Sequence, residues 1–443
     1  MPPNAAAVAD PPEAERAGAA RRWYVLSILT LVYALSIADR FVMSTLTEPI
    51  KADLRLSDFH IALLSGTSLA LFYVTVGLPL ASLADRTNRR NMVALALATW
   101  SLMTACSGLA LNLWQLMLAR IGVGIGEAGG TPPSTSLVSD YFPWRQRALA
   151  LSLYGVGASL GSMLGSGAGY ASDAWGWRSA FFVLGIPGIA LALVIGITIR
   201  EPERGRLDDV PPPARAGFLT TLRFIRDQPA LLHALIGATV FTLWSWGLMW
   251  WTPSYLVRSH HMTLGDAGGA LSLMYGLGGT AVLLLTMAIL AKVAKRDPRL
   301  VPAFAAAAIV LSTIPSIFAY TGTSRTFTIV MLWLFIPLSY APFGPTFALM
   351  QNLVPASMRA QTVAILLFSA NIANLVIAPQ AVGFASDVLA PVYGEESLRH
   401  ALVPLGFVGF WAAWHYGLCA KHLASGLARA GNAAGAPLTH QPA

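Results

Sequence analysis

Four ionisable residues lie inside long apolar stretches of the chain. Asp39 and Arg40 interrupt the stretch 23–48, and Arg120 and Glu127 interrupt the stretch 113–139. A carboxylate in apolar surroundings can take up a proton, and the planar guanidinium of arginine suits a phosphate or a carboxylate. These residues therefore indicate proton exchange and anion binding, or alternatively a fixed ion network that only ties two helices together.

The spacing of these residues limits how they can pair. Arg120 and Glu127 are seven residues apart, so on a helix they share a face but lie about 10 Å from each other. Asp39 and Arg40 are adjacent and would point about 100° apart. Neither pair is expected to close within its own helix.

The composition shows what surrounds these charges. The chain has 443 residues, of which 55% are hydrophobic and 11% charged, and its mean hydropathy is +0.60. Soluble domains carry roughly 25% charged residues, so this chain lacks the polar surface that a soluble protein of its length needs. Disordered, collagen-like and disulfide-scaffold classes are excluded by the same composition. A polytopic membrane protein remains.

Runs of about 20 mostly apolar residues, the length that spans a membrane, recur along the chain. We expect an all-α fold of twelve spanning helices, near 23–48, 60–84, 91–111, 113–139, 147–171, 178–199, 230–257, 265–291, 300–320, 326–354, 360–386 and 401–424. The expected domains are a disordered cytoplasmic tail (1–22), a six-helix bundle (23–199), a cytoplasmic linker (200–228), a second six-helix bundle (229–424) and a cytoplasmic tail (425–443).

Basic residues are distributed unevenly between the two sides of these spans. With the N-terminus inside, 21 of the 29 Lys and Arg residues fall on the inner side and 6 on the outer side, and the other two are Arg40 and Arg120. An excess of Lys and Arg marks the cytoplasmic side. We therefore expect a multi-pass protein of the cell (inner) membrane with both termini in the cytoplasm. The net charge of +8 is then a topology signal and does not indicate nucleic-acid binding.

Two parts of the chain, about 212 residues apart, resemble one another. The run 143–148 (PWRQRA) corresponds to 355–360 (PASMRA), and 169–173 (GYASD) corresponds to 383–387 (GFASD). Because six spans separate the copies, both enter the membrane from the same face. This predicts a parallel repeat with a substrate site between the two halves, near the midplane.

The loop between the second and third expected spans resembles the signature loop of the major facilitator superfamily, G-x-x-x-D-R-x-G-R-R. The run 77–90 reads GLPLASLADRTNRR. Ala81 stands where the first Gly of the pattern is expected, and Asn88 stands where the second is. Asparagine can adopt the left-handed turn geometry that glycine supplies. The run 120–126 (RIGVGIG) resembles a second motif of the family, R-x-x-x-G-x-G.

Within the superfamily, the chain resembles the spinster group. The run 120–127 is followed by PP at 132–133 and by SDYF at 139–142. The resemblance implies a secondary active transporter that works by alternating access, a proton-linked carrier of lysophospholipids or sphingoid phosphates. It also implies that spans one and four are neighbours that line a central cavity. Asp39 is then expected to pair with Arg120, or Glu127 with Arg40.

This resemblance and the residue types assign roles to the candidate site. Glu127 is the first candidate for the proton carrier and Asp39 the second, while Arg40 and Arg120 are the candidates for binding the substrate anion. The second half of the chain is aromatic instead of charged at membrane depth, which suits an apolar tail; its expected substrate contacts are Tyr340, Trp244 and Trp246. The expected partners are an amphipathic small molecule, protons and membrane lipids, and a monomer is expected.

The signature loop is expected to act as a conformational switch. By resemblance, Asp85 faces the N-terminus of the eleventh span, where the helix dipole favours an anion, and Arg86, Arg89 and Arg90 support it. The alternative is that the loop only sets the topology. Span five carries a face of small residues that lets helices approach closely, and the two glycines assigned to the switch are Gly155 and Gly165.

Other chemistry finds little support in the residues. The run 124–129 (GIGEAG) fits the dinucleotide pattern G-x-G-x-x-G, but it lies within a span and follows no strand. Cys106 and Cys419 are isolated, and the His residues form no H-E-x-x-H motif, so we expect no metal, no cofactor and no enzymatic activity. The serious alternative is a drug or organic-anion transporter of the same superfamily; an intramembrane enzyme or a channel is less favoured.

Overall fold

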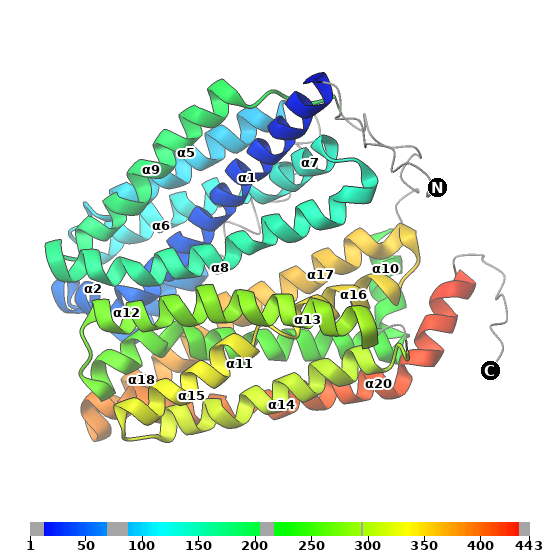
Figure 1. Cartoon of the computed structure of the whole chain (residues 1–443). Coiled ribbons are helices and arrows are strands. Elements are labelled where there is room, and N and C mark those ends of the chain that lie inside the picture. Colours follow the sequence, from blue (N-terminus) through cyan, green and yellow to red (C-terminus); the bar gives the residue numbers. More distant parts are fainter. Residues whose placement is uncertain (1–12, 69–86, 204–216, 294–295, 434–443) are drawn as a thin grey trace, which may run out of the picture.

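The chain folds into two helical bundles that lie one above the other in Figure 1. The computed structural model describes residues 13–68, 87–203, 217–293 and 296–433. Within these ranges every regular element is a helix, which confirms the expected all-α class. Eight helical stretches of the described chain are long and apolar enough to cross a membrane.

The upper bundle in Figure 1 is built from the first half of the chain. Its elements are α1 (Glu13–Thr45), α2 (Thr47–Leu54), α3 (Asp58–Ala62), the π-helical turn η1 (Leu63–Thr67), α5 (Arg89–Ser107), α6 (Leu113–Ala128), α7 (Thr131–Tyr141), α8 (Trp144–Trp175) and α9 (Trp177–Thr198). We call it the N-bundle. The expected span 60–84 is described only as far as residue 68.

The lower bundle, the C-bundle, is built from the second half. Its elements are α10 (Phe218–Arg226), α11 (Pro229–His260), α12 (Leu264–Leu273), the π-turn η2 (Met274–Gly278), α13 (Gly279–Val293), α14 (Leu300–Thr321), α15 (Arg325–Leu338), α16 (Phe343–Asn352), η3 (Ala356–Met358), α17 (Arg359–Asn371), the π-turn η4 (Ile372–Ile377), α18 (Ala378–Tyr393), η5 (Gly394–Glu396), α19 (Ser397–Gly406) and α20 (Val408–Ala433). The start of α1 and the end of α20 lie at the same end of the molecule (Figure 1), which we call the terminal end.

Helices extend into the stretches that the sequence assigns to tails and linker. The helix α1 begins at Glu13, inside the tail expected to be disordered, because strong helix formers (Glu, Ala and Arg) follow Pro12. The linker contains α10, and α20 continues to Ala433. The helices therefore extend beyond the ends of the apolar runs, at the N-terminal tail, in the linker and at the C-terminal tail.

Two of the expected spans are broken in the middle. The fourth span divides into α6 and α7 at Gly129 and Gly130, and Pro132 follows in the first turn of α7. The tenth span divides into α15 and α16 around Tyr340. The breaks lie about 212 residues apart, as the internal repeat requires. Interrupted helices near the middle of a span are typical of binding sites in transporters.

A ridge of glycines brings α8 into backbone contact with α1. A Cβ atom added at Gly157, Gly161 or Gly165 would lie 2.7, 2.3 or 2.4 Å from a carbonyl oxygen of α1, and these oxygens belong to Thr30, Ala34 and Ala38. The small-residue face expected of span five therefore packs against α1. Gly155 does not belong to it, since nothing lies within 4 Å of the position its Cβ would take; two residues from Gly157, it points to another side of the helix.

Asn88 acts differently from the expectation. Its φ of −72° lies outside the left-handed region, and its side chain accepts a hydrogen bond from the N–H of Asn91. Asn88 is thus the N-cap of α5 and does not replace glycine in a left-handed turn.

Candidate functional site

The first pair of the candidate site is buried inside the N-bundle. The Nη1 of Arg120 lies 2.9 Å from Oδ2 of Asp39, and Thr104 donates a hydrogen bond of 2.6 Å to Oδ1 of the same carboxylate. The Arg120 side chain is 0% exposed and that of Asp39 is 3% exposed. This pair joins α6 to α1, and its burial leaves it little access to a ligand.

The second pair lies one step further along the same two helices. Arg40 donates from Nε and Nη2 to Oε2 of Glu127, at 3.0 and 2.7 Å. The Arg40 side chain is 20% exposed, whereas that of Glu127 is 0% exposed. Among the described residues, the other oxygen of Glu127 has no hydrogen-bond partner. Both expected cross-helix pairings are therefore present and confirmed.

The local structure explains how these side chains meet. The close contact of Gly165 with Ala38 fixes the stretch of α1 that carries Asp39 and Arg40. A Cβ at Gly126 would lie 2.7 Å from the backbone nitrogen of Trp100, so this glycine lets α6 approach α5. Glu127 then sits at the last turn of α6, directly before the break at Gly129.

The three expected aromatic contacts divide between two environments. Trp246 is half-buried and packs between Phe41 of α1 and Phe343, with ring centroids 5.7 and 6.3 Å away. It therefore lies where the two bundles meet, against the residue that follows Arg40 in α1. Tyr340 is 4% exposed and lies 6.1 Å from the ring of Phe343, at the break of the tenth span.

Trp244 lies in the core of the C-bundle, so the expectation that it contacts the substrate is wrong. Its side chain is 0% exposed and packs against Phe241 and Phe335 inside the C-bundle. Residues two apart on a helix point about 200° apart, so Trp244 must face the core of the C-bundle when Trp246 faces α1.

Of the four signature-loop residues among the six expected to act in the switch, Asp85 and Arg86 lie outside the described residues. Arg89 binds within the N-bundle: it donates to Glu201 at 2.7 Å, to the carbonyl of Pro202 at 3.0 Å, and to Asp140. The backbone N–H of Arg90 donates to Glu201 at 2.9 Å. Sequence reasoning missed Asp140 and Glu201 as partners, although Asp140 belongs to the run 139–142 that it singled out.

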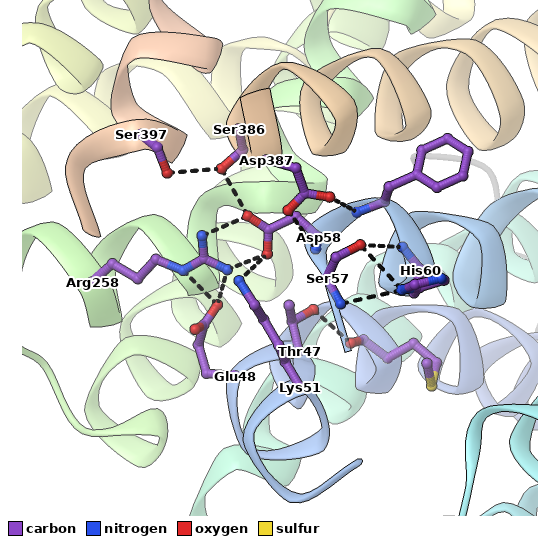
Figure 2. Close-up of polar contacts among 12 residues, drawn as sticks. Thr47, Glu48, Lys51, Ser57, Asp58, His60, Arg258, Ser386, Asp387 and Ser397 are labelled. Carbon is purple, nitrogen blue, oxygen red and sulfur yellow. Dashed lines mark hydrogen bonds and ion pairs between the residues drawn. The ribbon is translucent and has the colours of Figure 1, made fainter. Parts of the chain in front are cut away.

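A second cluster of charges (Figure 2) joins the two bundles at the end opposite the termini, where α2 and α18 lie in Figure 1. Arg258 of α11 binds both oxygens of Asp58 at 2.7 and 2.5 Å and also binds Glu48 at 2.9 Å. Lys51 adds an ion pair to Asp58 at 2.7 Å. Burial alone would raise the pKa of Asp58, but Arg258 and Lys51 lower it to about 2. Sequence reasoning missed this cluster, which we call the outer contact.

The repeated motif G-[YF]-A-S-D explains how the outer contact is built. Asp387 of α18 accepts hydrogen bonds of 3.0 and 2.9 Å from the N–H groups of Asp58 and Phe59 at the start of α3 (Figure 2). Asp173 of α8 accepts a bond of 2.7 Å from the N–H of Gly265 at the start of α12. Each copy thus anchors the N-terminus of a helix from the opposite bundle, where the helix dipole favours a carboxylate.

Comparison with known proteins agrees with this architecture. The sequence model of the Major Facilitator Superfamily matches residues 29–378. An MFS-type efflux pump of Mycolicibacterium smegmatis is 31% identical over 422 residues, which cover 92% of this chain and 96% of that protein. Human protein spinster homolog 1 is 25% identical over 415 residues, covering 87% of this chain and 78% of the human protein.

A solved structure supports the same family assignment. The crystal structure of a bacterial homolog of the human lysosomal transporter spinster, in an inward-facing and unoccupied conformation, superposes with a TM-score of 0.80 at 27% identity and covers 92% of this chain and 98% of its own. The family match spans most of the chain, and these relatives are carriers. The chain therefore belongs to the Major Facilitator Superfamily and is a membrane transporter of the spinster type, not an enzyme.

Proposed function

We propose that this protein is a proton-coupled carrier of an amphipathic, anionic, lipid-like small molecule, and that Arg40 and Glu127 form its coupling site. The observation that carries the proposal is the asymmetry of this pair: the guanidinium is partly exposed, while the carboxylate is fully buried. A ligand can therefore reach Arg40, and a proton can replace Arg40 on Glu127.

The exchange follows from the hydrogen bonds. A proton taken up by Glu127 removes the negative charge that holds Arg40. The guanidinium then offers its N–H groups to the phosphate or carboxylate of the substrate. When the substrate leaves and the proton is lost, the pair closes again. The Asp39–Arg120 pair remains in place during this cycle and holds α1 against α6.

Apolar surface for the substrate's tail begins at Phe41, the residue that follows Arg40 in α1. Phe41, Trp246 and Phe343 form a chain of ring contacts between α1 and the C-bundle, and Tyr340 continues it. A partly exposed arginine that directly precedes an aromatic contact between the bundles suits a molecule with an anionic head and an apolar tail.

The orientation of the protein belongs to the same proposal. The excess of Lys and Arg on one side supports a cell (inner) membrane location with cytoplasmic termini. The outer contact then closes the external side of the protein in the described conformation. We propose that a single copy of the chain is sufficient for transport.

Uptake by proteoliposomes tests the function. The protein is reconstituted and offered a fluorescent lysophosphatidylglycerol with and without an imposed pH gradient. We expect the gradient to accelerate uptake by the wild type but not by Glu127→Gln. Glu395→Gln, at the exposed η5 turn, is the matched control and should behave as the wild type. Equal gradient dependence in Glu127→Gln would contradict the proposal.

A second candidate, export of apolar cationic drugs, is supported by the similarity to the efflux pump of Mycolicibacterium smegmatis. The same proteoliposomes distinguish the two. If ethidium is carried and lysophosphatidylglycerol is not, and Arg40→Gln leaves ethidium transport intact, the drug-exporter function is favoured over the lipid carrier.

A further inference from the structure

A cavity of about 500 Å³ lies at the terminal end of the N-bundle, away from the coupling site. Its walls come from the start of α1, from the junction of α7 and α8, and from the residues that follow α9. Arg21, in its wall, precedes Asp39 by eighteen residues on α1, which is about 27 Å along a helix. The cavity is therefore separate from the proposed route of the transported molecule.

Three arginines line this cavity: Arg21 and Arg22 of α1, and Arg200 directly after α9. Arg21 and Arg22 are half-buried and Arg200 is exposed. Within the described ranges, no carboxylate or other acceptor binds the guanidinium group of any of the three. Three positively charged side chains, two from α1 and one from the segment after α9, thus line one cavity.

The acidic residues of the cavity are already engaged, with one exception. Asp140 and Glu201 both bind Arg89, and Glu201 also accepts from the backbone of Arg90. Glu203 is exposed and is the remaining carboxylate in the lining. Asp140 and Glu201 share one arginine, Arg89, so the three lining arginines and Arg89 together exceed the three carboxylates by one positive charge, which favours an anion.

The neighbours of the cavity place it at the membrane surface. Trp23 and Tyr24 are 44% and 40% exposed, and exposed Trp and Tyr at a helix end mark the interface between lipid and water. The hydroxyl of Tyr24 lies 2.8 Å from that of Thr198, which ties α1 to the end of α9. Trp23 packs edge-on against Phe142 at 5.3 Å. The cavity is therefore preformed.

We propose that this cavity binds the phosphate of an anionic membrane phospholipid, which stays bound and is not the transported molecule. Arginine forks are suited to phosphate oxygens, and basic pockets beside helix ends at a membrane surface bind anionic headgroups. The acyl chains of a bound lipid would run along the exposed rings of Trp23 and Tyr24. This binding is independent of the coupling chemistry at Glu127.

Thermal unfolding of the purified full-length protein in detergent tests the proposal. The probes are dioctanoyl phosphatidylglycerol, dioctanoyl phosphatidylcholine and inorganic phosphate. We expect phosphatidylglycerol alone to raise the Tm. Each Arg→Gln substitution at 21, 22 or 200 should weaken this effect about five-fold in apparent affinity. Arg299→Gln, an exposed arginine at the terminal end of the C-bundle, is the matched control and should leave the response unchanged.

Several results would overturn the proposal. Equal stabilisation by phosphatidylcholine would show that the headgroup charge plays no part, and stabilisation by inorganic phosphate alone would identify a free anion and not a lipid. An undiminished response of Arg200→Gln would also contradict it; this variant keeps the backbone carbonyl that accepts from Tyr141, so its folding is preserved. This experiment measures lipid binding and not transport. Its outcome can therefore be told apart from a failure of the proposed proton-coupled uptake.

Discussion

Arg40 and Arg120 carry the same charge in the same bundle, but their surroundings differ. The side chain of Arg120 is 0% exposed and fixed on Asp39, while that of Arg40 is 20% exposed and shares one oxygen of Glu127. A buried pair that loses one member leaves an uncompensated charge. A partly exposed guanidinium can change partners. We therefore expect the two arginines to respond to substitution in different ways.

Arg40→Gln should impair recognition of the anion and destabilise the protein less than Arg120→Gln, because a proton can replace Arg40 on the buried Glu127. Hydrogen bonds to charged groups contribute about 1.5–3 kcal/mol, so the apparent affinity for lysophosphatidylglycerol should fall about ten- to a hundred-fold. Arg40→Lys keeps the positive charge but loses the planar fork of N–H donors. Its apparent affinity should therefore lie between that of the wild type and that of Arg40→Gln. Concentration-dependent uptake measures this. An unchanged affinity in Arg40→Gln would exclude Arg40 from the binding site.

Arg120→Gln should instead destabilise the fold. It leaves the Asp39 carboxylate buried with Thr104 as its remaining side-chain donor among those described, and breaking a buried pair costs about 3–5 kcal/mol. The double variant Asp39→Asn/Arg120→Gln removes both charges and should recover most of that loss. Unfolding in detergent measures both. If Arg120→Gln keeps wild-type stability, the pair is not structural.

At this scale the sequence predicts charge pairs well and packing poorly. The four residues of the candidate site could be found because charge within an apolar run is conspicuous. The outer contact was missed because Asp58 and Arg258 lie at the ends of apolar runs, where charges are ordinary. The opposite directions of Trp244 and Trp246 follow from helical geometry, but which one faces α1 depends on the packing of the two bundles.

At the scale of elements, the internal repeat predicts features of the helices that the hydropathy pattern does not. Apolar runs alone predict continuous fourth and tenth spans, because Gly129 and Tyr340 do not interrupt the apolar pattern. The break in each becomes visible only in the backbone. The motif pair at 169–173 and 383–387, in contrast, was found in the sequence, and both copies perform the same anchoring role.

The glycine ridge of α8 gives a prediction with an internal control. Gly161→Val would place a side chain against the carbonyl of Ala34, at 2.3 Å from its Cβ, and overpacking of this kind costs about 1–3 kcal/mol. Gly155→Ala points into open space and should stabilise α8 by about 0.5–1 kcal/mol. Unfolding in detergent compares the two. Equal effects would show that the ridge does not set the contact between α8 and α1.

At the scale of the whole molecule, the two bundles are held together at the end opposite the termini. Asp58 contributes to this contact as a carboxylate. Because its pKa is lowered to about 2, the stabilisation is present at every pH above its usual value near 3.8 and is lost only as the pH falls through about 2. The outer contact therefore does not sense pH in the physiological range.

This predicts how the outer contact responds to pH and to substitution. Spin labels at Ala52→Cys and Glu395→Cys, both exposed on opposite bundles, with Cys106 and Cys419 replaced by Ala, report the separation of the bundles. We expect the same distance at pH 5 and pH 8 and a broader, longer distribution in Arg258→Gln. A large pH-dependent change in Glu127→Gln would mean that the outer contact itself titrates.

The central claim is that Glu127 exchanges Arg40 for a proton when the substrate binds. The direct measurement is proton uptake by the purified protein in weakly buffered detergent solution, recorded with a pH dye as lysophosphatidylglycerol is added. The wild type should take up close to one proton per bound substrate, and Glu127→Gln should take up none. Substrate binding without proton uptake in the wild type, or equal uptake in Glu127→Gln, would contradict the mechanism.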